Sequence, residues 1–180
     1  MNEFVGLVLA AGQGKRFGGP KAPFKLNGER LVDRAVRVLT EAGAQRVFVV
    51  LGAWVGEVPH AEIIENSEWP SGMGSSLKVG LNALLETTDS QRVVVTLVDL
   101  PGLTAEAVAR VAKDSGRITV GTYDGNRGHP VAFNREHWVD VAMSAHEDSG
   151  ARDFLKAHSN EIHFVEVGDV ASGEDLDLRP

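Results

Sequence analysis

The chain opens with an apolar run that leads into a glycine-rich loop, and this combination limits the folds it can adopt. Residues 4–11, FVGLVLAA, have the composition of a buried β-strand. Glycines let a main chain approach a ligand closely, and their N–H groups can point at an anion. The following segment therefore predicts a phosphate-binding turn of an α/β protein; it holds Gly12, Gly14, Gly18 and Gly19 among the cations Lys15, Arg16 and Lys21.

This loop differs from the two commonest phosphate motifs. A P-loop needs a glycine where the chain has Leu9, and a serine or threonine where it has Arg16. A dinucleotide-binding fingerprint that starts at Gly12 fails at Phe17. Asp33, at about the right distance to hold a ribose, falls inside an expected amphipathic helix. An ordinary glycine-rich turn with solvated lysines is the alternative interpretation.

Composition narrows the class of protein. A length of 180 residues with 43% hydrophobic content fits one domain spanning residues 1–180. The absence of cysteine excludes disulfides, thiolate metal sites and a cysteine nucleophile. The net charge of -7 disfavours nucleic-acid binding, and the chain shows neither a membrane-length apolar stretch nor a signal peptide. We therefore expect a cytoplasmic protein with no nucleic-acid or membrane partner.

Apolar runs of strand length alternate with helical patterns along the chain. We expect strands at residues 4–11, 46–51, 61–64, 93–98, 118–122, 130–133 and 162–167. We expect helices at residues 30–42, with Gly43 as C-cap, at 72–85, after an N-cap at Thr104, at 136–144 and at 151–158. This order predicts a mostly parallel sheet between helical layers, with the ligand outside the carboxyl ends of the strands.

Asp99 is the candidate carboxylate at that edge. It directly follows the apolar run 93–98, which is expected to be a central strand. Carboxylate oxygen suits Mg²⁺, which takes one or two carboxylates together with substrate phosphates. The alternative is a turn or capping aspartate before Pro101.

Five segments in this order resemble the MobA/MocA-like molybdenum cofactor nucleotidyltransferases: LAAGQGKRFGGPK, NSEWPSGMGSSLKVGL, VDLPGLT, GNRGHPVAF and EDSGARDFL. They extend from Leu9 to Leu155, and the second segment points to the MocA-like, CTP:molybdopterin cytidylyltransferase branch. The resemblance implies a GT-A-like, Rossmann-like nucleotide-diphospho-sugar transferase fold. This fold is a three-layer α/β/α arrangement with a mostly parallel, mixed sheet.

The resemblance also implies nucleotidyl transfer, in which an acceptor phosphate attacks the α-phosphorus of a nucleoside triphosphate. Arg16, Lys21 and Asp99 are the implied catalytic residues, with Lys15 and Lys25 as weaker cation candidates. The implied nucleotide-binding residues are Leu9, Ala10, Ala11, Gly12, Gly14, Arg16, Lys21, Gly72, Ser75 and Ser76. For Gly72, Ser75 and Ser76 the alternative is a structural role, in which Ser71 or Ser75 caps the helix.

A second carboxylate is implied for the Mg²⁺ site. The family pattern G-D-x-G-A-R places Asp148 beside Asp99 as a metal ligand, although Glu147 stands where the family has glycine. Asp148 as an N-cap of the following helix is the alternative. His129 and Arg152 are the candidate acceptor-binding residues; a structural histidine and a helix-surface arginine are the alternatives.

The tail, residues 173–180, resembles the D-I-D-T-P-E-D ending of the family but departs from it at Leu178 and Arg179. We expect an acidic, solvated terminus with a contact to the pocket.

Ala11 indicates which nucleotide the protein uses. Guanylyl-transferring members have a second glycine in L-A-G-G, whereas the methyl of Ala11 narrows the base pocket and favours CTP over GTP. The expected acceptor is molybdopterin, with a molybdoenzyme as recipient of the product. The alternatives are a GTP-using guanylyltransferase, a transferase for another phosphorylated acceptor, a non-catalytic maturation factor, and an oxidoreductase for a nicotine-derived pigment.

Overall fold

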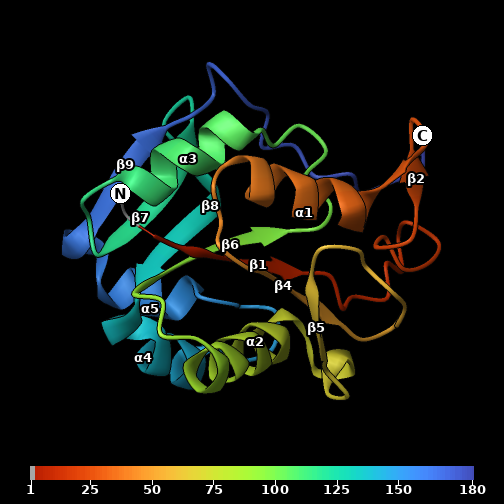
Figure 1. Ribbon diagram of the computed structural model, residues 1–180, viewed down its shortest axis with the longest axis horizontal. Coiled ribbons are helices and arrows are strands. Elements are labelled where there is room, and N and C mark those ends of the chain that lie inside the picture. The colour runs from red at the N-terminus through yellow and green to blue at the C-terminus, as the bar shows by residue number, and fades with distance from the viewer. Residues whose placement is uncertain (1–2) are drawn as a thin grey trace.

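A computed structural model describes residues 3–180 around a mixed seven-stranded sheet of order β5-β4-β1-β6-β8-β7-β9 (Figure 1). Its strands are β1 (Val5–Leu9), β4 (Val47–Leu51), β5 (Glu62–Glu65), β6 (Arg92–Leu97), β7 (Ile118–Tyr123), β8 (Asn126–Asn134) and β9 (Ile162–Glu166). All neighbours pair in parallel except β8, which is antiparallel to both β6 and β7. The mostly parallel, mixed sheet is therefore confirmed, and β6 lies at its centre.

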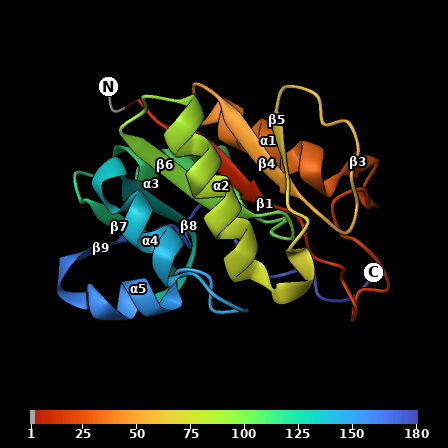
Figure 2. The same ribbon diagram turned by 90° about the horizontal axis from the view of Figure 1, so that it is seen from below.

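Helices cover both faces of the sheet. They are α1 (Leu31–Glu41), α2 (Met73–Thr87), α3 (Ala105–Lys113), α4 (Trp138–Ser144) and α5 (Arg152–Ala157), with short 3₁₀ helices at Trp69–Ser71, Arg135–His137 and Ser159–Glu161. Helices α1 and α3 lie on one face, and α2, α4 and α5 lie on the other (Figures 1 and 2). The three-layer arrangement is confirmed. No helix within residues 3–180 has the length and apolar character that a membrane crossing requires.

The alternating side chains of β1 divide the core in two. Val8 belongs to the cluster beneath α1 and α3 and packs there with Leu39. Leu7 and Leu9 belong to the cluster beneath α2, which also contains Leu81. A strand that is buried on both faces reads as a continuous apolar run, which explains the pattern of residues 4–11.

The ends of two helices follow their sequence signals. The hydroxyl oxygen of Thr104 accepts a hydrogen bond from the N–H of Ala107 at 3.2 Å, so Thr104 is the N-cap of α3. After α1 the chain turns at Gly43, which has φ +101° and donates its N–H to the carbonyl of Thr40. The N-cap prediction is confirmed, whereas the C-cap of α1 is Ala42 and Gly43 is the residue that follows it.

Two hairpins depart from the sequence expectation. Strand β8 begins at Asn126 rather than at Pro130, because a turn at Asp124 and Gly125 pairs its polar half with β7. A second hairpin joins β2 (Lys25–Leu26) to β3 (Glu29–Arg30) through Asn27 and Gly28. Both turns have two consecutive residues with positive φ, as a two-residue hairpin turn requires. Hydrophobic runs alone do not show such strands, because these segments are mainly polar.

Glu166 of β9 fastens the β7–β8 hairpin. Its carboxylate accepts hydrogen bonds from the N–H groups of Asp124 at 2.9 Å and Gly125 at 3.2 Å, and from the hydroxyl of Thr122 at 2.8 Å. The N–H of Gly168 donates to it at 3.0 Å. These donors, first that of Asp124, lower the pKa of Glu166 from 4.5 to about 2. These hydrogen bonds tie the turn of the hairpin that carries His129 to β9.

We expect Glu166→Gln to lower the melting temperature at pH 7 and to have a smaller effect at pH 3. Because the folded-state pKa is depressed, the carboxylate stabilises the fold above pH 4.5, and its contribution disappears as the pH falls towards 2. Thermal unfolding at pH 7 and pH 3 measures the difference. Glu161→Gln, at an exposed residue of the same region, is the control. Equal penalties for Glu166→Gln at both pH values would contradict this account.

Candidate active site

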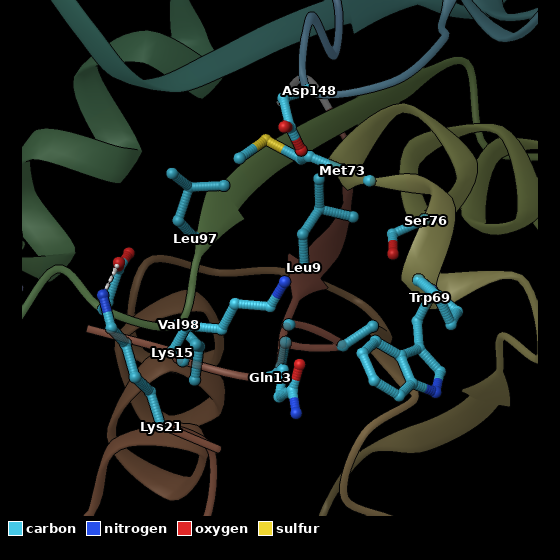
Figure 3. A pocket seen from close by; sticks show the side chains of 17 residues that line it. Leu9, Gln13, Lys15, Lys21, Trp69, Met73, Ser76, Leu97, Val98 and Asp148 are labelled. Carbon is cyan, nitrogen blue, oxygen red and sulfur yellow. Dashed lines mark hydrogen bonds and ion pairs between the residues drawn. The ribbon is translucent and has the colours of Figure 1, made fainter. Parts of the chain in front are cut away.

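A cavity of about 480 Å³ lies at the carboxyl ends of β1 and β6 (Figure 3). The first strand and its loop line one side with Leu9, Ala10, Ala11, Gly12, Gln13, Gly14, Lys15 and Lys21. The other residues that line it are Trp69, Pro70, Gly72, Met73, Ser76, Leu97, Val98, Asp99 and Asp148. It occupies the edge of the sheet at which ligands of α/β proteins bind.

An ion pair between Lys21 and Asp99 stands at one side of this cavity. Lys21 Nζ donates to Asp99 Oδ2 at 2.7 Å, and the two side chains are only 15% and 18% exposed (Figure 3, dashed line). Asp99 does not cap α3, since Thr104 does. The pair brings together a cation that suits a phosphate and a carboxylate that suits a divalent metal.

The backbone of the glycine-rich loop closes on itself. The carbonyl of Gly14 accepts the N–H groups of Gly18 at 2.8 Å and Gly19 at 3.0 Å. Gly14 has φ +62°, and a Cβ atom there would overlap the carbonyl oxygen of Gly19. Only glycine fits this position, which explains one of the residues that marked the loop in the sequence.

Lys15, rather than Arg16, reaches into the cavity. Figure 3 shows the Lys15 side chain extending across the cavity towards Leu9. The side chain of Arg16 is 79% exposed, lies 3.5 Å from Asp177 Oδ1 and is not part of the lining. Lys15 thus lies in the cavity and Arg16 outside its lining, a difference that sequence does not show because side-chain direction in an irregular loop follows no period. Which of the two binds phosphate stays a prediction. Lys25 is exposed on β2 and lies outside the cavity.

The serines at the start of α2 separate into two roles. Ser76 lines the cavity, whereas Ser75 lies outside the lining and donates its hydroxyl to the carbonyl of Gly72 at 2.8 Å. Neither Ser71 nor Ser75 caps α2, which has no side-chain cap.

Asn66, directly after β5, holds both serines. Its Nδ2 donates to Ser75 Oγ at 2.9 Å and to Ser76 Oγ at 3.0 Å, and its Oδ1 accepts the N–H of Glu68 at 2.9 Å. It is 2% exposed. The sequence analysis assigned no role to Asn66. The signal that could have identified it is its position directly after a strand, within a segment that resembles the family.

Asp148 lines the cavity opposite the loop and does not cap α5, whose N-cap is Ala151. Gly72 makes room for it: with φ +113°, a Cβ atom there would lie 2.7 Å from Asp148 Oδ1. Within residues 3–180 no group of three or more His, Cys, Asp and Glu side chains forms a metal cluster. Asp99 and Asp148 both line the cavity, and one or two carboxylates are what a divalent cation such as Mg²⁺ takes when water and phosphate complete its coordination.

The candidate acceptor residues lie outside the cavity lining. His129 is partly buried on β8, and its carbonyl accepts the hydroxyl of Tyr123 at 2.6 Å. Burial lowers the pKa of His129 from 6.5 to about 4, while the negative charge of Asp99 acts in the opposite direction. The imidazole is therefore neutral at pH 7. Arg152 is the first residue of α5, and its acceptor role stays a prediction.

The C-terminal tail packs on the site. Leu176 donates its N–H to the carbonyl of Asp99 at 2.9 Å, and Asp177 Oδ1 lies 3.6 Å from Lys21 Nζ. Burial, followed by the charges of Asp99 and Asp177, raises the pKa of Asp175. The expected pocket contact is thus present, and most of the tail is exposed, as expected: Glu174, Asp175, Leu178, Arg179 and Pro180.

A family model described as MobA-like NTP transferase domain matches residues 6–162. The chain belongs to this family. Its membership makes the protein a nucleotidyltransferase.

Two curated relatives bear different names. Nicotine blue oxidoreductase of Paenarthrobacter nicotinovorans is 36% identical over 96% of this chain and 91% of that protein. Molybdenum cofactor guanylyltransferase of Rhizobium johnstonii is 26% identical over 91% of this chain and 80% of that protein.

Solved structures agree with the fold. The Mycobacterium sp. strain JC1 homologue of Mycobacterium tuberculosis Rv0371c superposes with a TM-score of 0.80 at 27% identity, covering 97% of this chain and 90% of that one. A manganese complex of the Mycobacterium tuberculosis protein gives a TM-score of 0.74 at 20% identity, covering 92% and 88%.

Glu147 has a positive φ of 45°, at the position where the family pattern has glycine. A left-handed backbone costs a residue with a side chain about 1–2 kcal/mol, and glycine's greater freedom in the unfolded chain cancels part of the gain. We therefore expect Glu147→Gly to raise the free energy of unfolding by about 0.5–1 kcal/mol in urea titrations. Glu147→Ala, which keeps the Cβ atom, is the control and should not stabilise the protein. Destabilisation by glycine would contradict the proposed strain.

Proposed function

We propose that this MobA-like protein is a divalent-metal-dependent nucleotidyltransferase that moves CMP from CTP to molybdopterin, working as one domain over residues 1–180. The observation that carries the proposal is the 2.7 Å pair between Lys21 and Asp99 in a cavity beside the glycine-rich loop. This pair unites the two charges that a triphosphate and its metal need. The proposed setting is the cytoplasm, with a molybdoenzyme as recipient of the product.

The proposed reaction needs no nucleophile from the protein. An acceptor phosphate oxygen forms a bond to the α-phosphorus of CTP, the bond to the β-phosphate oxygen breaks, and pyrophosphate leaves. Catalysis is then positioning and charge stabilisation. Lys21 and Lys15 neutralise the triphosphate from the cavity, and Arg16 binds it from the rim after turning away from Asp177.

Asp99 and Asp148 are the proposed ligands of the divalent cation, Mg²⁺ in this proposal. A divalent cation held there would neutralise negative charge on the phosphate oxygens. The ammonium of Lys21 lies 2.7 Å from Asp99 Oδ2, so a cation bound at this oxygen would displace it locally. Release from Asp99 frees the same ammonium for a phosphate of the substrate.

Ala11 and Trp69 are proposed to shape the base site. Both line the cavity, and Gly52 lies between them: a Cβ atom at Gly52 would be 2.9 Å from Ala11 Cβ and 2.6 Å from Trp69 Cβ. Leu9, Ala10, Gly12 and Gly14 complete the proposed nucleotide site on this side, and Gly72 and Ser76 complete it on the other. Ser75 supports the site through Asn66.

Molybdopterin as acceptor is supported by the resemblance and by the relative named molybdenum cofactor guanylyltransferase. His129 and Arg152 remain the proposed acceptor contacts. Neutral His129 offers a hydrogen bond to the acceptor without adding charge beside Asp99. GTP in place of CTP is the closest alternative within the same chemistry.

The relative named nicotine blue oxidoreductase favours a second candidate function, reduction of a pigment of that kind. A hydride donor such as a nicotinamide or a reduced flavin is then required. The loop after β1 lacks the dinucleotide fingerprint that binds such a cofactor. We therefore place this function second.

We expect Asp99→Asn to lower kcat at least about 100-fold while the protein stays folded, because one metal-binding charge is lost. Asp148→Asn should have the same direction. Pyrophosphate release with CTP, Mg²⁺ and molybdopterin measures the effect, and circular dichroism checks the fold. Asp140→Asn, at an exposed residue of α4, is the matched control. Undiminished turnover of Asp99→Asn would refute the metal assignment.

We expect a clear preference for CTP in a panel of CTP, GTP, ATP and UTP, and a shift by Ala11→Gly towards GTP. Removing one methyl from a base pocket changes discrimination by about 10-fold. The ratio of kcat/KM for GTP and CTP is the measurement. Equal use of both nucleotides by the unmodified protein would overturn the base assignment. NADH or NADPH oxidation without any triphosphate binding would favour the oxidoreductase.

A further inference from the structure

The C-terminal tail, residues 173–180, ends beside the glycine-rich loop. Figure 1 shows the C-terminus next to β2, far from the end of β9 in the view. Two anchors hold the tail there. Leu176 donates its N–H to the main-chain carbonyl of Asp99 at 2.9 Å, and Arg179 contacts the loop directly.

Arg179 binds the loop through two kinds of contact. Its Nε donates to the carbonyl of Phe17 at 3.1 Å, and its Nη2 donates to the carbonyl of Gly18 at 3.3 Å. Its guanidinium lies 5.3 Å from the centre of the Phe17 ring and 5.6 Å from that of Phe24. These two rings pack edge to face at 4.9 Å. Arginine thus joins loop carbonyls and an aromatic pair in one contact.

A contact that orders the glycine-rich loop affects the free energy of ligand binding. Gly18 and Gly19 have φ of +87° and +148°, and the loop also contains Gly12 and Gly14. Glycine loses more conformational freedom on ordering than any other residue. A contact that orders the loop before the ligand arrives removes part of this cost from the binding step.

The two anchors connect both halves of the proposed site. One lies on the main chain of Asp99, and the other lies on the loop that precedes Lys21. Between them, Asp177 lies 3.6 Å from Lys21 Nζ. The tail therefore spans from the strand end that carries the carboxylate to the loop that leads to the cation.

We propose that Arg179 is a positioning residue for nucleotide binding, which fastens the tail to residues 17–18 and so holds the glycine-rich loop and Lys21 in place relative to Asp99. The identity of the ligand rests on the proposed function. The ordering of the loop is a property of the protein without nucleotide.

The experiment uses the full chain with Arg179→Ala and Arg179→Lys. Hydrogen exchange of the amides of residues 12–21 is measured without nucleotide, and KM for CTP and kcat are measured separately. For Arg179→Ala we expect exchange of these amides to be about 10-fold faster. KM should rise about 10-fold while kcat changes less than about 2-fold, since uniform binding is lost. Arg179→Lys should recover part of both effects, because lysine keeps the charge over the rings and donates to one carbonyl.

Arg46→Ala is the matched control. Arg46 likewise lies over an aromatic ring, 4.8 Å from the centre of Phe48, and donates to a main-chain carbonyl, that of Thr87, at 2.7 Å. It lies just before β4, away from the cavity lining. This variant should leave the exchange of residues 12–21 and KM for CTP unchanged.

Unchanged exchange of residues 12–21 in Arg179→Ala would overturn the proposal whatever the activity. Faster exchange with an unchanged KM in an active enzyme would overturn the role in nucleotide binding. If the unmodified protein binds no triphosphate in equilibrium dialysis, the proposed function fails together with this nucleotide role. The exchange data then still decide whether Arg179 orders the loop.

Discussion

The pairing of β1 with β6 is the constraint on which the rest of the site depends. The two parallel strands are in register at Leu9 and Leu97, so both end at the same level of the sheet. The loop that leaves β1 carries Lys21, and the turn that leaves β6 carries Asp99, 2.7 Å away. At an effective dielectric constant of about 20, such charges attract by several kcal/mol, an attraction that desolvation partly cancels. The pair is therefore close enough to contribute to holding the two strand ends together.

Acidic and basic side chains lie close together at this cavity. The loop gathers cations in a chain whose net charge is -7, and the acidic tail returns to meet them. Burial beside Asp99 and Asp177 raises the pKa of Asp175, whereas the charges of Lys21 and Arg16 act to lower it. His129 stays neutral for the same physical reason that makes buried charges costly. Two of the loop cations thus have carboxylate partners: Lys21 pairs with Asp99 and Asp177, and Arg16 with Asp177.

Local patterns could predict most of the fold but only part of the site. The apolar strands, the N-cap at Thr104 and the turn at Gly43 depend on near neighbours in the chain, and the structure contains all three. The polar half of β8 was missed because its pairing with β7 leaves no hydrophobic period. Lys15 was ranked below Arg16, and Asn66 was overlooked, because burial and side-chain direction in loops have no signature in sequence.

The sequence by itself determined the α/β class, the glycine-rich loop after the first strand, the carboxylate at the end of a central strand and the family. Each of these features depends on a contiguous stretch of residues, because periodicity and composition are local properties of the sequence. Only the tertiary structure decided which loop cation enters the cavity, that Asp148 faces it, and that Arg179 clamps the loop. These contacts join distant parts of the chain: Lys21 and Asp99 are 78 residues apart, and Phe17 and Arg179 are 162 apart. Packing of the whole sheet and its helices sets such distances, and no local pattern encodes them.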